Sequence, residues 1–333
     1  MRARFCLEET SFRLPKLKKI ELSARIATLL DLMDQCRNDG HRILRHDSLE
    51  SVELQPGVLL AELLYARHPD LDDTLRRRLQ LAIDRCQHLE DAAPDSEDGS
   101  TASGVKTNEV DPNALQVGAE TVRDAPSIAF AHQQYTDGNA VACLVLDQGP
   151  RRPGRHPVRY RARTWDLHFI AQAAGQLRAF YREIAEIEDL DKHAYFGVAA
   201  LAFPELHFAD GLSLQWNAMK QPYRQLRPVV TQHLAMLNDH FPAIFAHHKG
   251  QPDPIMREVR ARFDIELSPE SPGTRRNKAA IRQRLVQVGP HTLPCQWHTK
   301  LSRTAGRIHF HPGDPHILGG KLLIGLFADH LDT

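Results

Sequence analysis

The sequence has little of several features that mark whole classes of proteins. Only five of its 333 residues are cysteine, an odd number without CxxC spacing, which is typical of reduced thiols and argues against a disulfide framework or a zinc knuckle. No apolar run approaches the roughly eighteen residues that a membrane-spanning helix needs. The N-terminus has no uninterrupted apolar core of the kind found in signal peptides. We therefore expect a cytoplasmic protein that does not associate with membranes.

A net charge is also absent, because 42 basic residues balance 42 acidic ones. No overall field would draw the chain to nucleic acid, so any such binding must come from a local patch. The sequence contains no Walker A loop, GxGxxG, HExxH, GxSxG or EF-hand loop. These absences exclude the enzyme classes that are easiest to find by motif, and we predict no cofactor.

What is present predicts an α+β protein with more than one domain. A chain of 333 residues with 42% hydrophobic residues exceeds what one core usually covers. Three amphipathic helical patterns predict a helical bundle over residues 1–92. Residues 93–125, rich in Ser, Asp, Glu, Gly and Ala, are typical of a flexible polar linker. Residues 126–333 are expected to form a larger domain, in which helices pack on an antiparallel or mixed sheet.

Within the larger domain, a buried apolar run at 140–147 and an alternating run at 158–164 predict two strands. The segment from Thr164 to Leu190 has apolar residues at helical spacing and is expected to be the longest helix of the chain. The domain ends in a predicted β-meander over residues 282–331.

The strongest pattern lies in this meander. In the run RIHFH, Arg307, His309 and His311 point to one side, whereas Ile308 and Phe310 point to the other. The preceding run CQWHTKL alternates in the same way, and the following run LLIGLF is nearly continuously apolar. The alternation indicates a half-buried strand with a cationic face, paired with strands before and after it.

Four residues would share one face of two paired strands, where cross-strand neighbours lie about 5 Å apart: His298, Lys300, Arg307 and His309. Two histidines beside fixed cations suit metal-independent phosphodiester cleavage. One imidazole would accept the proton of a ribose 2′-hydroxyl and the other would protonate the leaving oxygen. The lysine and arginine would stabilise the charge of the phosphorane. We predict these four as the catalytic residues.

Two other interpretations concern the same strands. Zinc would take ligands such as Cys295, His298, His309 and His311, but Cys295 and His298 lie three apart on a strand and therefore on opposite faces, so no metal site is predicted. Alternatively, the histidines and cations form the polar side of a sheet and bond to a partner or to the rest of the chain.

Two cationic loops would add phosphate contacts, although such runs are by default only solvated loops. The predicted nucleic-acid-binding residues are Arg151, Arg152, Arg155, Arg275, Arg276 and Lys278.

The order basic loop, WHTKL, turn, RIHFH, loop, KLLIGLFADHL resembles the C-terminal half of RelE-type toxins and related small ribonuclease-like modules, over Pro269 to Leu331. In that family an R-I-x-F strand and a glycine-containing apolar strand ending in histidine build the central sheet. The resemblance implies that Arg307 matches the family's strand arginine and that Lys300 is a further basic candidate. The compact size and strongly basic character of the family are missing here, which puts ribosome-dependent cleavage in doubt.

The upstream arrangement also resembles uncharacterised bacterial proteins encoded with defence genes. We therefore expect a toxin-like or antiphage-defence-associated protein that acts on RNA, free or on the ribosome. The alternative is a non-catalytic subunit that docks a protein partner within a multi-protein defence complex.

Overall fold

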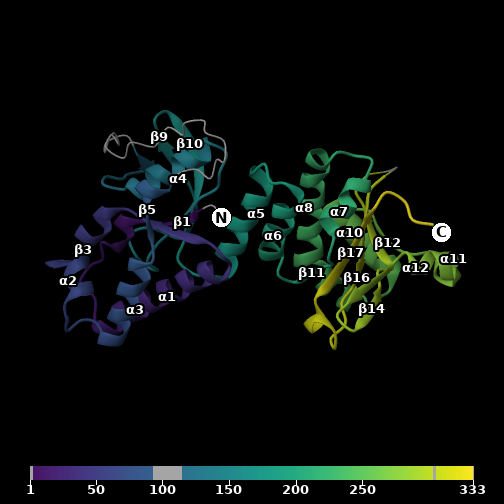
Figure 1. Cartoon of the computed structure of the whole chain (residues 1–333), viewed down its shortest axis with the longest axis horizontal. Coiled ribbons are helices and arrows are strands. Elements are labelled where there is room, and N and C mark those ends of the chain that lie inside the picture. Colours follow the sequence, from purple (N-terminus) through teal and green to yellow (C-terminus); the bar gives the residue numbers. More distant parts are fainter. Residues whose placement is uncertain (1–2, 93–114, 303–304, 333) are drawn as a thin grey trace. The chain divides into compact units, whose positions relative to one another are not determined.

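The computed structural model describes residues 3–92, 115–302 and 305–332, and it divides the chain into two compact units. Unit 1 comprises Met1–Glu188 and unit 2 comprises Asp189–Thr333 (Figure 1). Both units combine helices with mixed sheets, as the sequence predicts. Among the described residues, no helix combines the length and apolar character needed to cross a membrane.

Unit 1 is built on an eight-stranded sheet with the order β5-β2-β1-β8-β10-β9-β6-β7. The first five strands in this order run parallel to one another, and the last three pair antiparallel. Parallel strands need crossover connections, and the connections from β1 to β2 and from β2 to β5 carry helices. The strands are β1 (Ala3–Leu7), β2 (Arg42–Arg45), β5 (Gln87–His88), β6 (Gln116–Val117), β7 (Glu120–Thr121), β8 (Ala142–Leu144), β9 (Gly154–Tyr160) and β10 (Arg163–Ile170).

The helices of unit 1 bury one apolar face each. In α1 the buried residues Ile26, Leu30 and Met33 recur at helical spacing, and α3 begins where Asp72 accepts hydrogen bonds from the backbone N–H groups of Thr74 and Leu75. The helices are α1 (Lys19–Asn38), α2 (Leu60–Tyr65), α3 (Asp73–Asp84), α4 (Pro126–Thr136) and α5 (Ala174–Ile187). A small hairpin of β3 (Glu53–Gln55) and β4 (Val58–Leu59) precedes α2.

The predicted N-terminal helical bundle is not confirmed. The three predicted helices are present, but they alternate with β1, β2 and β5, which join β8 in one sheet. Of the predicted linker, residues 93–114 lie outside the described part of the chain. Residues 116–121 form the β6–β7 hairpin, which pairs with β9. The boundary between the two units along the chain lies between residues 188 and 189, whereas the linker was predicted at residues 93–125.

The prediction of one helix from Thr164 to Leu190 is wrong at its start. Residues up to Ile170 belong to β10, which pairs with β9 over seven residue pairs, and α5 follows only at Ala174. The β9–β10 turn consists of Arg161 and Ala162, both with positive φ (47° and 63°). Two-residue hairpin turns of this kind usually contain Gly or Asn. Because neither is present, the turn could not be recognised from the sequence.

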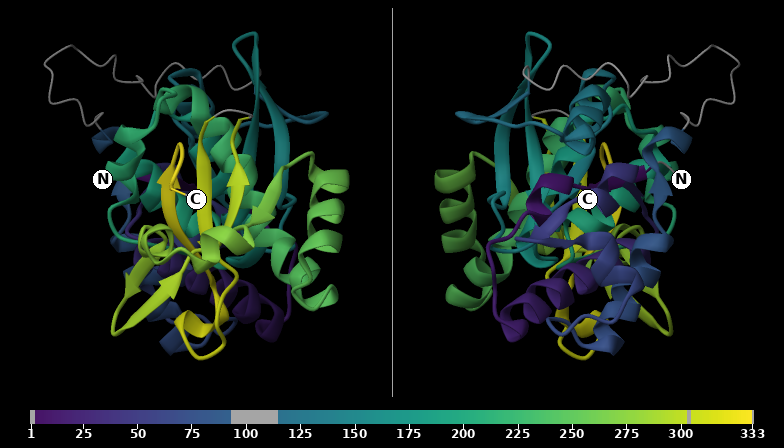
Figure 2. Two further views of the ribbon diagram at one scale, coloured as in Figure 1. Left: turned by 90° about the vertical axis from the view of Figure 1, so that its right-hand side faces the viewer. Right: turned by 90° about the vertical axis from the view of Figure 1, so that its left-hand side faces the viewer.

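Unit 2 contains a five-stranded sheet with the order β11-β17-β16-β15-β12. The predicted C-terminal meander is present, since β15, β16 and β17 pair antiparallel in sequence (Figure 2, yellow strands in the left view). The strands are β11 (Leu206–Phe208), β12 (Leu267–Pro269), β15 (Trp297–Lys300), β16 (Arg307–His311) and β17 (Leu322–Ala328), and a separate hairpin consists of β13 (Leu285–Val288) and β14 (His291–Pro294).

Two helices of unit 2 pack on one face of this sheet. On α8, His233 Nδ1 lies 2.9 Å from Thr299 Oγ1 of β15. On α9, the Phe241 ring packs edge-to-face on Phe310 of β16. The helices are α6 (Lys192–Ala202), α7 (Leu212–Gln215), α8 (Tyr223–Asp239), α9 (Phe241–His247), α10 (Pro252–Phe263), α11 (Pro272–Arg276) and α12 (Lys278–Arg282). The opposite face of β15 and β16 carries the predicted catalytic residues.

Candidate functional site

The strand register brings the four predicted catalytic residues onto one face. His298 of β15 pairs with His309 of β16, and Lys300 pairs with Arg307. The two imidazole rings lie 5.1 Å apart, centroid to centroid. The alternating sequence pattern therefore predicted that these four residues lie side by side on two paired strands.

Solvent reaches this neighbourhood unevenly. His309 is 1% exposed and His298 9% exposed, so both imidazoles are largely buried. Burial lowers the pKa of His309 to about 3, with a further contribution from His298. A histidine held neutral in this way is a poor general acid at neutral pH. The catalytic role of the four residues stays a prediction, and the burial favours a structural role.

Two residues that the sequence analysis missed complete the buried part of this face. Glu270, which follows β12, and Arg284, which follows α12, form a buried ion pair with 2.8 Å between Oε1 and Nε. The same carboxylate oxygen lies 3.3 Å from His298 Nδ1 and 3.6 Å from His309 Nδ1. Burial would raise the pKa of Glu270, but the neighbouring His298 and Arg284 outweigh it and lower the pKa to about 2.

The two cations at the outer end of the face are also engaged. Lys300 Nζ lies 3.2 Å from Glu266 Oε2. Arg307 Nη2 lies 3.2 Å from His330 Nε2, and its Nη1 donates to the Asp329 carbonyl at 3.5 Å. These half-exposed groups are held by neighbours on their own unit.

Cys295 does not meet the histidines. It is fully buried in an apolar cluster with Val286, Leu293 and Leu323, and burial raises the pKa of its thiol to about 12. A thiol in such surroundings is inert. The strand geometry that argued against a Cys295-based zinc site is consistent with this placement.

The predicted nucleic-acid-binding residues fall into different environments. Arg151 is buried, pairs with Glu120 at 3.0 Å and lies over the Phe169 ring. Arg152 is exposed. Arg155 is exposed in part but reaches into a cavity of unit 1. In unit 2, Arg275, Arg276 and Lys278 are exposed at α11 and the start of α12.

A cavity of 470 Å³ lies in unit 1, between the last parallel strand of the sheet and the helix that follows it. Its volume falls in the range of small-molecule sites. The carboxyl ends of parallel strands are where open α/β sheets bind ligands, and here β10 ends at Ile170 beside this cavity. The polar lining residues are Arg155 from β9, His168 from β10, and Gln176, Arg178, Arg182, Glu183 and Glu186 from α5.

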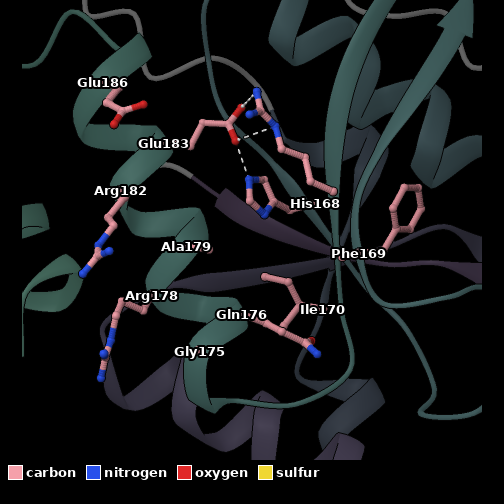
Figure 3. A pocket seen from close by; sticks show the side chains of 12 residues that line it. His168, Phe169, Ile170, Gly175, Gln176, Arg178, Ala179, Arg182, Glu183 and Glu186 are labelled. Carbon is pink, nitrogen blue, oxygen red and sulfur yellow. Dashed lines mark hydrogen bonds and ion pairs between the residues drawn. The ribbon is translucent and has the colours of Figure 1, made fainter. Parts of the chain in front are cut away.

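A histidine–carboxylate pair stands in this cavity. Figure 3 shows Glu183 reaching from α5 to His168. Nε2 of His168 makes a short hydrogen bond to Glu183 Oε2, and Arg155 Nε lies 3.3 Å from the same oxygen. His168 and Glu183 are each 6% exposed. The guanidinium groups of Arg178 and Arg182 point away from His168 (Figure 3), so Arg155 is the cation at the pair.

The pair fixes the state of the imidazole. An ionised carboxylate only accepts hydrogen bonds, so Nε2 of His168 is the donor, and in the neutral imidazole Nδ1 then carries the lone pair. Nδ1 has no hydrogen-bond partner among the residues that the structure describes. A histidine oriented in this way by a carboxylate is the arrangement of a general base.

The sequence contained a pattern that pointed to the His168–Glu183 pair. The helical period assumed for Thr164 to Leu190 concealed it. Treated as part of one helix, His168 and Glu183 lie fifteen residues apart, about four turns, and do not meet. Treated as a strand, WDLHFI alternates, and it places His168 opposite Arg155 of the cationic loop. Recognition of the β9–β10 turn would have shown that residues 163–170 form a strand.

Comparisons with known proteins add no relative to this picture. No protein-family model, no curated protein and no solved structure matches the chain.

Proposed function

We propose that this chain is a metal-independent ribonuclease and that its catalytic pair is His168–Glu183 in unit 1. The observation that carries the proposal is the unpartnered Nδ1 of His168 in a 470 Å³ cavity beside Arg155. The reaction class is the one that the strand histidines suggested from sequence. The residues that supply it differ, because His168 lines the cavity of unit 1, whereas His309 is only 1% exposed.

The proposed cleavage begins with a proton transfer to His168. Nδ1 of His168 takes the proton of a ribose 2′-hydroxyl, and that oxygen attacks the adjacent phosphorus. The 5′-oxygen leaves and takes a proton from solvent, which balances the proton held by the imidazolium. Arg155 stabilises the charge on the non-bridging oxygens of the phosphorane. The products are a 2′,3′-cyclic phosphate and a free 5′-hydroxyl.

RNA is the expected substrate for two reasons. The C-terminal strands resemble ribonuclease-like modules, which also suggests a toxin-like role. The exposed Arg152 lies just before β9, the strand that carries Arg155. Arginine is well suited to binding phosphate groups in successive nucleotides. The exposed cations Arg275, Arg276 and Lys278 of unit 2 have no role in the proposed reaction.

The test uses the purified full-length chain with an end-labelled RNA in buffer without added divalent metal. The wild type is expected to give fragments that end in 2′,3′-cyclic phosphate. His168→Asn, which keeps a polar side chain of similar shape, is expected to lose about 100-fold or more in rate. Substituting Arg155 with Lys keeps the charge but changes the geometry, and a loss of rate is expected here as well.

His291→Asn is the matched control, because His291 is an exposed histidine on β14 in the other unit. Its activity is expected to equal that of the wild type. An inactive wild type, with or without ribosomes, would contradict the proposal, as would His168→Asn cleaving at the wild-type rate. A stable partner co-purifying with an inactive chain would instead favour the docking role.

A further inference from the structure

Three strands of unit 2 bring three metal-ligating side chains to one buried point. His298 and His309 face each other across β15 and β16. Glu270 extends the β12–β15 pairing by one residue, since its backbone N–H donates to the Gln296 carbonyl at 2.7 Å. The ligating atoms of the three side chains all lie within 4.8 Å of one another. This cluster is separate from the cavity of unit 1.

The distances match the edges of a coordination polyhedron. Zinc binds histidine nitrogen and carboxylate oxygen at about 2.0–2.2 Å, so neighbouring ligands of a tetrahedral site lie about 3.3–3.5 Å apart. Glu270 Oε1 lies 3.3 Å from His298 Nδ1 and 3.6 Å from His309 Nδ1. A single ion would therefore reach all three atoms with small adjustments of the side chains.

The hydrogen bonds around the cluster orient lone pairs toward its centre. His298 Nε2 lies 3.1 Å from Ser268 Oγ. With the ring proton on that nitrogen, the lone pair of Nδ1 faces the Glu270 carboxylate. A cation between these two groups would bind to both. In metal sites, the ring nitrogen of a ligating histidine that does not bind the ion regularly makes a hydrogen bond, which fixes the tautomer.

His309 distinguishes a metal ion from a proton at this point. Within the described part of the chain, neither of its ring nitrogens has a hydrogen-bond partner, although the side chain is 1% exposed. A proton on His298 Nδ1 would satisfy His298 and Glu270 and would leave His309 unpaired. An ion would satisfy all three side chains, which removes the cost of a buried polar group without a partner.

Arg284 is compatible with this role. Its Nε lies 2.8 Å from Glu270 Oε1 in an ion pair, and its Nη1 donates to the Ala280 carbonyl at 2.7 Å. Each carboxylate oxygen has two lone pairs, so the oxygen that pairs with Arg284 has one available for a ligand bond. Arginine would hold the carboxylate in place as an outer hydrogen-bond donor.

We propose that Glu270, His298 and His309 bind a divalent transition-metal ion, with the chemistry of zinc, that holds β12, β15 and β16 together. Two imidazole nitrogens and one carboxylate suit such an ion better than calcium or magnesium, which favour oxygen ligands. Because the ligands are buried, the ion's role is to fix the strands.

The experiment measures metal content and metal-dependent stability of the full chain. Wild-type protein is expected to contain an equimolar amount of zinc or iron after purification. After extraction with a chelator, added Zn²⁺ is expected to raise the Tm, whereas added Mg²⁺ is not. Ser268→Ala is expected to weaken zinc binding by about 10-fold or more.

Glu270→Gln and His309→Gln test the ligands, and His311→Gln is the matched control on the same strand. His311 Nδ1 bonds to the Gly313 backbone and lies outside the cluster. The two ligand variants are expected to lose the Tm response to Zn²⁺, and the control is expected to keep it. If a variant does not fold, equilibrium dialysis of the wild type against Zn²⁺ still decides. A wild type that neither contains nor binds a transition metal overturns the proposal. So do ligand variants that bind as the wild type does. Neither result bears on RNA cleavage by unit 1.

Discussion

Glu9 and Ser127 meet in the interior of unit 1, where the serine hydroxyl donates to the carboxyl group of Glu9 and both side chains are 0% exposed. Glu9 follows the end of β1, and Ser127 lies in the first turn of α4. Burial, together with the neighbouring Glu8, raises the pKa of Glu9 to about 8. Glu8 itself faces Thr10 and Arg151. At neutral pH, therefore, Glu9 is mostly protonated in the folded chain.

This raised pKa predicts that unit 1 loses stability as pH rises. Between about pH 4.5 and pH 8 the folded chain holds a proton on Glu9 that the unfolded chain releases. The corresponding stabilisation is complete below pH 4.5 and is lost as pH rises through 8. Glu9→Gln keeps the shape and the acceptor but cannot ionise. We expect its free energy of unfolding to vary less with pH, and to exceed that of the wild type at pH 9.

Urea denaturation of both proteins between pH 5 and pH 9 measures this difference. Glu186→Gln, on the exposed surface of α5, serves as the control and is expected to follow the wild type. Parallel pH curves for the wild type and Glu9→Gln would refute the assignment of a neutral Glu9.

The second prediction concerns Glu183. Replacing it with Gln is expected to lower kcat for RNA cleavage by about tenfold or more with little change in KM. An amide is able to donate to Nε2 of His168, which then favours the tautomer with the proton on Nδ1. Initial rates over a range of RNA concentrations separate the two constants. A rise in KM with kcat unchanged would mean that Glu183 serves substrate binding alone.

The third prediction uses a close approach in unit 2. A Cβ atom on Gly325 would lie 2.3 Å from Cys295 Sγ and 2.8 Å from Val286 Cγ2. Gly325→Ala is therefore expected to destabilise the chain by about 1–3 kcal/mol through overpacking. Adding Cys295→Ala removes the nearer atom and should recover part of the loss. Chemical denaturation of the single and double variants checks this, and a double variant with fully additive losses would speak against the contact.

The fourth prediction concerns the link between β1 and the end of unit 1. Arg4 forms a buried ion pair with Glu188, whose Oε1 also accepts from the Ala140 backbone N–H at 2.8 Å. Arg4→Met leaves the carboxylate without its charged partner, and we expect a loss of about 3–5 kcal/mol. The double variant with Glu188→Leu should be less destabilised than the sum of its parts. Additive losses in a thermodynamic cycle would show that the pair is not coupled.

Strong local periodicity made parts of this structure predictable. The alternation of RIHFH and WHTKL predicted that His298, Lys300, Arg307 and His309 share a face, and the register places them there. The same alternation carries no information on what covers that face. Glu270 and Arg284 arrive from loops after β12 and α12, and only the folded chain shows that they close off the histidines.

Other parts were out of reach for a physical reason. The strands β2 and β5 have four and two residues, which is too short to display a period. Their pairing depends on neighbours far along the chain, so the stronger helical periods of residues 1–92 favoured a bundle. The cavity of unit 1 depends on a hairpin turn at Arg161 and Ala162 that lacks the usual residues.

The position of β1 in its sheet has a consequence for partial chains. Cys6 of β1 pairs directly with Cys143 of β8, 137 residues further along. A nascent or truncated chain that stops before Ala142 would have β1 with one neighbour and one bare edge of backbone N–H and C=O groups. Such an edge invites pairing with other chains. Fragments of this length would therefore tend to aggregate, and safe shortening of unit 1 would have to retain β8.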